Sequence, residues 1–298
     1  MPELPEVEIV ARTLAPQVQG KRIATVNVLL PKSLQDKAGL FPLLAGSIID
    51  RVYRRAKLLL LSLTLGETKH TETKGRHAGK NQADASLILA FHLKMTGSFF
   101  IHPVGTPPLK HTRIIFDLEG AGGPAGRLFF DDTRTFGFCR VMRPEDLNDW
   151  PFWARLGPEP LEGTVEDLVE HFALTFKNRR GTIKAALLDQ SAVAGIGNIY
   201  ADEALFRAGI RPDAKACSLN EVRLRKLAAD LRDILHLSIR ECGSSIRDYR
   251  DANGKAGAFQ NSFAVYGRKG QPCQKCGQIL QSTRIAGRGT VFCGCCQS

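Results

Sequence analysis

Near its end the chain reads CQKCGQILQSTRIAGRGTVFCGCC (residues 273–296), a stretch with five of the eight cysteines. It contains two C-x2-C pairs separated by sixteen residues. Each two-residue gap lets a tight turn direct two thiolates at one tetrahedral ion, and the longer gap is enough for a β-hairpin. The spacing therefore predicts one zinc site with four ligands: Cys273, Cys276, Cys293 and Cys296.

Cys295 leaves an alternative open, because a C-x-C pairing with Cys293 could use it in place of Cys296. In either case the protein fills all four positions on the metal, so we expect zinc to fold the hairpin and not to catalyse a reaction. The other three cysteines are scattered and are expected to be buried thiols; they are Cys139, Cys217 and Cys242.

The charge of the chain indicates a polyanionic partner. Its 298 residues carry a net charge of +11, and from Gly243 onward eight Lys or Arg residues stand against two Asp and no Glu. Arg284 and Arg288 lie at the expected turn of the zinc hairpin, where a guanidinium can bind a phosphate through two hydrogen bonds. These features favour nucleic acid as the partner.

Hydropathy argues against a membrane protein. No apolar run approaches the ~20 residues that a membrane span requires, and the N-terminal sequence lacks the basic and apolar regions of a secretory signal. We therefore expect a cytoplasmic protein, associated with the nucleoid if the partner is DNA.

The periodicity of apolar residues predicts a β-rich half followed by a helical half. Six β-type runs without intervening helices indicate an antiparallel sandwich or barrel; they are residues 22–30, 47–65, 87–95, 113–118, 127–132 and 136–142. After a Pro/Gly-rich linker the pattern becomes helical, at about residues 164–177, 182–190, 198–208 and 219–241. We expect three domains, at 1–155, 156–242 and 243–298.

Three local features refine this division. The polar segment 66–86 is interpreted as a hairpin insertion between two strands. Ser218 and Glu221 have the spacing of a capping box for the last helix. In AVAGIGNIYADE, two glycines precede a helix with Asn198 at the expected cap position, and the exposed N–H groups of such a helix start form an anion site suited to phosphate.

The opening sequence MPELPEVE predicts a helix that runs to about Gln19, with Pro2 suited to its first turn. Pro2 could also be a reagent. A free chain terminus has a pKa of about 8, so roughly a tenth of it is neutral and nucleophilic at pH 7. Glu3 and Glu6 lie three residues apart, on the same helical face.

Several motifs in order resemble the formamidopyrimidine-DNA glycosylase family: MPELPEVE, RRAK, HLKMTG, DTRTFG, LLDQ with VAGIGNIYADE, GKAGAFQ with VYGR, and the cysteine pairs around GRGT. The resemblance implies an α+β multidomain fold, with an N-terminal antiparallel β-sandwich flanked by helices and a C-terminal helix-two-turn-helix domain with a zinc-finger hairpin. It also implies a monomeric, bifunctional enzyme of base excision repair that excises 8-oxoguanine and formamidopyrimidines from duplex DNA and cleaves the strand at the abasic site.

The same resemblance implies roles for individual residues. Pro2, once Met1 is removed, matches the nucleophile that forms a Schiff base with the sugar. Glu3 matches the general acid, and Glu6 a supporting carboxylate. Lys57 matches the residue assigned to β-elimination, and Arg288 the finger arginine that binds phosphate and is assigned to δ-elimination.

Further positions match residues that contact DNA. Three of them fill the space left by the everted base, namely Met95, Arg134 and Phe136. Others contact the DNA elsewhere: His111, Arg179, Lys184, Asn198 and Tyr266. The stretch Ile246–Gln260 resembles the mobile loop that closes over the everted base.

Two other functions remain open on the sequence. One is an endonuclease VIII-like glycosylase that acts on oxidised pyrimidines. The other is a non-catalytic zinc protein that only recognises damaged DNA, which would show the same charge and the same cysteine pairs. Both share the DNA partner; the first would differ in the damaged base that it excises, and the second would form no covalent adduct at Pro2.

Overall fold

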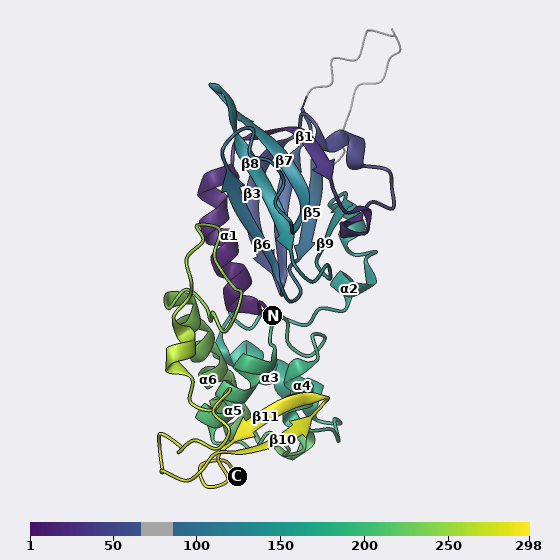
Figure 1. The fold of residues 1–298 in the computed structure, drawn as a ribbon. Helices are drawn as coiled ribbons and strands as arrows, with labels where there is room; N and C mark the ends of the chain where they lie inside the picture. The colour runs from purple at the N-terminus through teal and green to yellow at the C-terminus, as the bar shows by residue number, and fades with distance from the viewer. Residues whose placement is uncertain (67–85) are drawn as a thin grey trace. The chain divides into compact units, whose positions relative to one another are not determined.

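The computed structural model describes residues 1–66 and 86–298 (Figure 1). The described chain forms two compact units. The first comprises Met1–Pro2, Val7–Ala154 and Arg247–Ala256, and the second comprises Glu3–Glu6, Arg155–Ile246 and Gly257–Ser298. The predicted division into three domains stays a prediction. The segment predicted as a hairpin insertion lies outside the described residues, except for its two ends, Gly66 and Ser86.

One hydrogen-bonded sheet organises the first unit, and in the described residues its strand order is β2-β9-β5-β4-β3-β1-β7-β8-β6. The strands are β1 (Arg22–Val28), β2 (Leu34–Gln35), β3 (Ile48–Arg55), β4 (Leu58–Thr64), β5 (Ser86–His92), β6 (Gly97–His102), β7 (Thr112–Gly120), β8 (Gly123–Asp132) and β9 (Phe138–Met142). Every pair is antiparallel except β2 with β9, so the sheet is mixed.

The sheet folds over on itself. Phe91 of β5 contacts Phe99 of β6 and Phe130 of β8, with ring centroids 4.9 and 5.4 Å apart. Strands β4, β3, β1 and β7 lie between β5 and β8 in the sheet order. These rings can meet only if the two halves of the sheet face each other, with their inward side chains interdigitated. The predicted β-sandwich in the N-terminal half of the chain is therefore confirmed.

The run LLLLSL in β4 is explained by burial on both faces. Leu59, Leu61 and Leu63 point into the core between the two halves of the sheet. Leu58 and Leu60 point the other way, into a smaller cluster around Trp150, which precedes the short helix α2 (Pro151–Ala154).

Helix α1 (Leu4–Val18) ends one residue before the predicted position. Its apolar side chains recur at helical spacing, and those of Val7, Val10, Leu14 and Val18 are almost completely buried in the sheet core. Burial of each such side chain stabilises the fold by about 1.5–3 kcal/mol.

The second unit is helical. Its elements are α3 (Val165–Phe176), α4 (Ile183–Leu188), α5 (Asn198–Ala208), α6 (Glu221–Arg240) and a two-stranded hairpin of β10 (Gln281–Ile285) and β11 (Arg288–Phe292). Across both units, the described residues also contain five short 3-10 helices: η1 (Pro31–Ser33), η2 (Phe41–Leu44), η4 (Glu145–Leu147), η5 (Ala216–Ser218) and η6 (Phe259–Ser262). Nine of the eleven residues of α5 are buried, which requires its polar side chains to find partners inside the unit.

Two predicted helix caps are wrong. Asn220, not Ser218, caps α6, and it accepts the Arg223 N–H at 3.0 Å. The hydroxyl of Ser218 donates to the Lys215 carbonyl instead, because Ser218 belongs to η5. Helix α5 begins at Asn198 itself, with Gly197 at the cap position.

Candidate functional site

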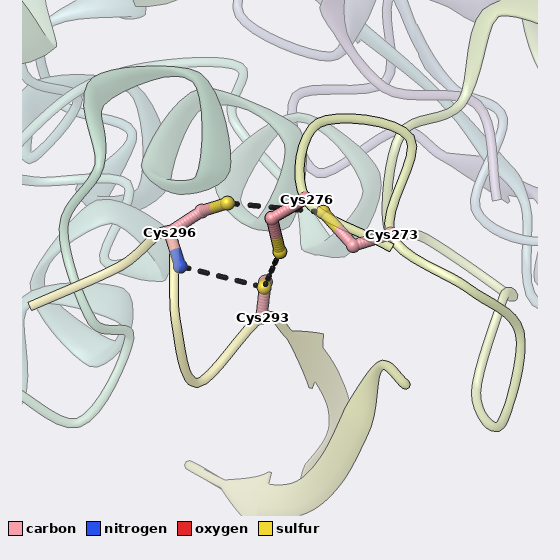
Figure 2. Close-up of side chains that lie close together, drawn as sticks. All are labelled: Cys273, Cys276, Cys293 and Cys296. Atoms are coloured by element: carbon pink, nitrogen blue, oxygen red, sulfur yellow. Dashed lines mark hydrogen bonds between the residues drawn. The ribbon is translucent and has the colours of Figure 1, made fainter. Parts of the chain in front are cut away.

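The four predicted zinc ligands lie together (Figure 2). The Sγ atoms of Cys273, Cys276, Cys293 and Cys296 are all within 4.8 Å of one another, with separations of 3.9 Å for Cys273–Cys296 and 3.5 Å for Cys276–Cys293. A tetrahedral zinc with Zn–S bonds of about 2.3 Å has sulfur–sulfur edges of about 3.8 Å, whereas a disulfide requires about 2 Å. The arrangement fits zinc and excludes disulfides within this cluster.

The structure also decides the fourth ligand. Cys295 is exposed and does not belong to the cluster, so Cys296 completes the zinc site. The prediction of buried thiols elsewhere holds for Cys139 but is wrong for Cys217 and Cys242, which are exposed. Cys217 lies in η5, and Cys242 follows the end of α6 with a φ of 60°.

The zinc hairpin is attached to the helices through its second strand. The carbonyl of Gly289 accepts hydrogen bonds from Lys184 Nζ at 3.2 Å and from Asn198 Nδ2 at 3.0 Å. Lys184 Nζ also donates to Thr290 Oγ1 at 2.7 Å. Arg288, the residue before Gly289, is exposed. Lys184 and Asn198 therefore fix the backbone beside Arg288.

Lys184 has no exposed surface and forms a buried ion pair with Asp202 of α5, with Nζ 2.6 Å from Oδ1. Burial lowers the pKa of Lys184 and raises the pKa of Asp202 to about 7, while the attraction between the two charges opposes both shifts. Removal of one partner of such a pair strongly destabilises the fold, because it leaves the other charge buried and unpaired. The structure thus places Lys184 inside the unit, under the hairpin.

Glu3 lies at the start of α5. Its carboxylate accepts the Ile199 N–H at 3.1 Å, and only 3% of the residue is exposed. A Cβ on Gly197 would lie 2.3–2.7 Å from the Glu3 carboxyl group, so this approach requires glycine. The predicted anion site exists, but this N–H binds an internal carboxylate and not a phosphate.

Glu6 connects the N-terminal turn to the end of α6. Its Oε2 accepts the Glu3 N–H at 2.9 Å, and its Oε1 accepts the Tyr200 hydroxyl at 2.5 Å. The same Oε1 accepts both the N–H and the hydroxyl of Ser244, at 2.8 and 2.9 Å. Glu6 therefore orients the backbone of Glu3 and the first residues after Gly243.

One end of the sheet gathers the candidate residues of the first unit. Strands β4, β6, β7 and β9 begin at this end, and β5 and β8 finish there, as the pairs Leu58–His92, His92–Phe138, Gly97–Asp132 and Thr112–Asp131 show. The connections at this end carry five predicted site residues: Lys57, Met95, His111, Arg134 and Phe136. Antiparallel pairing thus brings together residues that are far apart in the sequence.

Three of these five side chains are exposed to solvent, namely those of Met95, Arg134 and Phe136. Met95 is 38% exposed and Phe136 is 55% exposed, which is unusual for large apolar residues and excludes a core role. The Arg134 guanidinium lies 5.2 Å from the centre of the Phe136 ring. Thr135 between them has a φ of 57°, a left-handed conformation that must be held by its surroundings.

Asp132, which the sequence did not identify, holds this turn. It is almost fully buried, and its carboxylate accepts the Thr96 hydroxyl at 2.5 Å and the N–H of Gly137 at 2.7 Å. The N–H of Arg134 also donates to it, at 3.2 Å. The sequence signal was available, since an aspartate two residues before a turn residue often bonds to the turn backbone.

Lys57 follows Ala56, whose φ of 53° makes the tight turn between β3 and β4. Lys57 is only 7% exposed. It contributes to the electrostatics of His92, whose pKa is lowered to about 3 by burial and by the charges of Lys94 and Lys57. His92 is therefore neutral near pH 7, and its Nδ1 accepts the Lys94 N–H at 3.1 Å.

This shift predicts acid sensitivity of the first unit. Between about pH 6.5 and pH 3 the unfolded chain binds a proton at His92 that the folded chain does not, so stability falls as the pH falls, by about 1.4 kcal/mol per pH unit. We expect the stability difference between wild type and His92→Asn, measured by denaturant unfolding, to shift by about 2 kcal/mol in favour of the variant from pH 7 to pH 5. A pH-independent difference would contradict the assignment.

Two other predicted contacts are placed on the second unit. Arg179 is half-buried and forms an ion pair with Asp189, with Nη1 and Oδ2 2.7 Å apart. Tyr266 is the last residue of a short segment that is held by the buried carboxylate of Glu203. The N–H groups of Ala264, Val265 and Tyr266 all donate to this carboxylate. Glu203 was also missed by sequence reasoning, although its place on a buried helix indicated that it needs partners.

Pro2 is buried, lies two residues before the start of α1 and is grouped with the first unit. In the described part of the chain, no helix is long and apolar enough to cross a membrane.

A mixed sheet with helices, a helical unit and a hairpin closed by four cysteines define a zinc-finger protein of the helix-two-turn-helix class. Family models match all three parts: the formamidopyrimidine-DNA glycosylase N-terminal domain at residues 1–139, the helix-two-turn-helix domain of the same enzymes at 156–250, and a zinc finger found in FPG and IleRS at 270–298.

Relatives that match the chain over its whole length are formamidopyrimidine-DNA glycosylases as well. A formamidopyrimidine-DNA glycosylase of Nitratidesulfovibrio vulgaris is 44% identical, with 100% of both chains covered, and one of Carboxydothermus hydrogenoformans is 40% identical with the same coverage. The crystal structure of MutM (FPG) from Thermus thermophilus superposes with a TM-score of 0.81 at 38% identity, covering 99% of this chain and 98% of that one. The chain belongs to the formamidopyrimidine-DNA glycosylase family.

Two structures of Lactococcus lactis relatives contain DNA. A mutant FPG in complex with Fapy-dG-containing DNA has a TM-score of 0.82 at 31% identity, with 100% of both chains covered. The Fpg in complex with DNA that contains an abasic site has a TM-score of 0.81 at 30% identity, with 99% of both chains covered.

Proposed function

We propose that this protein is a bifunctional DNA glycosylase and abasic-site lyase that excises oxidised purines, 8-oxoguanine and formamidopyrimidines, from duplex DNA in base excision repair. The observation that carries the proposal is the similarity to formamidopyrimidine-DNA glycosylases over the whole length of the chain, with family models of that enzyme matching both its N-terminal and its helix-two-turn-helix part. The Lactococcus lactis relatives, solved with Fapy-dG-containing and abasic DNA, support the same substrates here.

Pro2 is the proposed nucleophile after removal of Met1. Its nitrogen forms a bond with C1′ of the damaged nucleotide while the bond from C1′ to the base breaks, and the base departs with the bonding electrons and a proton. The C1′–O4′ bond of the sugar ring then breaks, which turns this adduct into an iminium. Pro2 is a secondary amine, so the iminium cannot lose its charge by losing a proton from nitrogen. It then accepts electrons when a proton leaves C2′ and the 3′ phosphate departs.

Glu3 is the proposed general acid, which protonates the sugar ring oxygen as the ring opens. Its burial and its hydrogen bond from Ile199 support this role, because they hold the carboxyl group in one place next to Pro2 in the chain. Glu6 supports it by accepting the Glu3 N–H.

Two cationic residues are proposed for the elimination steps. Lys57 assists β-elimination, in which the 3′ phosphate leaves. Arg288 binds the phosphate that leaves in δ-elimination, and its guanidinium acts as a clamp, because a guanidinium is a poor proton donor but presents several N–H groups to a phosphate. The bonds from Lys184 and Asn198 to Gly289 support the placement of Arg288.

The exposed sheet end is proposed to fill the duplex where the damaged base has left it. Met95 fills the gap, Arg134 bonds to the orphaned base and Phe136 wedges the neighbouring step. The exposure of Met95 and Phe136 supports this role. His111, Arg179 and Tyr266 are proposed to contact DNA, and Lys184 and Asn198 to act on it through the zinc hairpin.

We place this activity in the cytoplasm, on the nucleoid. The eight cysteines, all of which lie within the described ranges, form no disulfide, which suits a reducing compartment.

Base-release rates on two duplexes test the substrate assignment. One contains 8-oxoguanine opposite cytosine, and the other contains thymine glycol opposite adenine. We expect faster release of 8-oxoguanine, because the chain belongs to the purine-specific family. A clear preference for thymine glycol would instead identify an endonuclease VIII-like specificity.

A further inference from the structure

The segment Arg247–Ala256 packs in the first unit, although the residues on both sides of it belong to the second. Its central part, Asp251–Lys255, forms a self-contained turn, hereafter the anchored turn. The Asp251 carboxylate accepts the N–H groups of Asn253 and Lys255 at 2.9 and 2.8 Å. The Asp251 N–H donates to the Lys255 carbonyl at 3.0 Å, and Gly254 has a φ of 77° that suits glycine.

Two polar side chains of α1 hold the anchored turn. Thr13 Oγ1 accepts the Ala252 N–H at 3.1 Å. Gln17 Nε2 donates to Asn253 Oδ1 at 3.2 Å and to the Ala252 carbonyl at 3.5 Å. Thr13 and Gln17 are four residues apart, so they lie one above the other on the same face of the helix.

Burial reinforces these bonds. Ala252 is only 4% exposed and belongs to the same core cluster as Val10 and Leu14 of α1. Asp251 is 5% exposed. A buried N–H that loses its acceptor is costly, so Thr13 is strongly coupled to the position of Ala252. In Figure 1 the segment Arg247–Ala256, in yellow-green, runs alongside α1.

The residues before the anchored turn differ from it. Ile246, Arg247, Asp248 and Arg250 are exposed. This stretch starts after Ser244, which donates to Glu6, and Glu6 accepts the Glu3 N–H. Exposed residues that adjoin a fixed turn lose less conformational entropy when they bind a ligand.

We propose that Thr13 and Gln17 are positioning residues for recognition of the damaged base. They hold the anchored turn, and the turn holds the exposed residues just before it, Arg247, Asp248 and Arg250, ready to contact an everted base. This inference rests on the proposed glycosylase function. Cleavage at a preformed abasic site has no base to hold, so it does not need the anchored turn.

The test uses the full-length zinc-bound protein and two single-turnover rates. One is base release from an 8-oxoguanine duplex, and the other is strand cleavage of a duplex with a preformed abasic site. Thr13→Val removes the hydroxyl without changing the shape of the side chain, and Gln17→Ala removes the amide. We expect each variant to release base about five- to tenfold more slowly and to cleave the abasic duplex within about twofold of wild type.

Two matched variants serve as controls. Thr13→Ser retains the hydroxyl and should restore base release. Gln19 follows the last residue of the same helix, and its side-chain amide donates to the Asp50 carbonyl and not to the anchored turn. Gln19→Ala should therefore change neither rate. Amide hydrogen exchange should be faster at Ala252 in Thr13→Val.

Each other outcome is decisive. If Thr13→Val and Gln17→Ala release base at the wild-type rate, or if both rates fall together, the positioning role is wrong. Unchanged exchange at Ala252 would show that the anchor does not hold the turn. A wild-type protein that acts on neither duplex would instead overturn the proposed function, and the inference with it.

Discussion

Glutamine in place of Glu3 is expected to lower the rate of base excision by about a hundredfold or more, which is the usual contribution of a positioned general acid. The substitution retains an oxygen that can accept the Ile199 N–H, so helix α5 should keep its start. It removes only the proton that the carboxyl group delivers. Single-turnover base release from an 8-oxoguanine duplex measures the effect, with DNA binding measured in parallel.

Glu8→Gln is the matched control. Glu8 lies on the same helix but forms surface-side ion pairs with Arg12 and Arg54, and we expect its substitution to change the rate less than about threefold. A Glu3→Gln variant that binds DNA and excises the base at the wild-type rate would remove Glu3 from the chemistry.

Loss of one zinc ligand is expected to abolish the hairpin. In Cys276→Ser the remaining three thiolates hold zinc too weakly to fold a hairpin with so small a core. We expect less than about a tenth of a zinc ion per chain and DNA binding at least about tenfold weaker, because Arg288 is no longer held in place. Metal analysis and a binding titration at fixed salt measure the two effects.

Cys295→Ser provides the control for this experiment. Cys295 is adjacent to a ligand but lies outside the cluster, so one zinc per chain and normal DNA binding are expected. Loss of zinc from Cys295→Ser with retention in Cys296→Ser would mean that the fourth ligand is Cys295.

Much of the fold could be predicted from periodicity and spacing. The helical spacing of apolar residues in α1 and the two C-x2-C pairs were sufficient, because both depend on local geometry. Strand β6 was missed, since a left-handed turn at Lys94 separates it from β5 and the sequence does not reveal that conformation. The parallel pairing of β2 with β9 involves only two residues of each strand and has no periodic signal.

The site could be predicted less completely. Motifs located Lys57, Arg134 and Phe136, but only the strand register brings them to one end of the sheet. The burial of Lys184 depends on Asp202, a long-range partnership that charge patterns cannot reveal. The helix start at Gly197 was predicted to bind an anion, yet the identity of that anion, Glu3, required the tertiary fold.

Reductive trapping tests the central claim most directly. Protein verified to begin at Pro2 is incubated with duplex DNA that contains an abasic site, reduced with borohydride and digested, and the modified peptide is sequenced by mass spectrometry. We predict a covalent adduct on the nitrogen of Pro2. An adduct on another residue such as Lys57, or no adduct at all, would contradict Pro2 as the nucleophile.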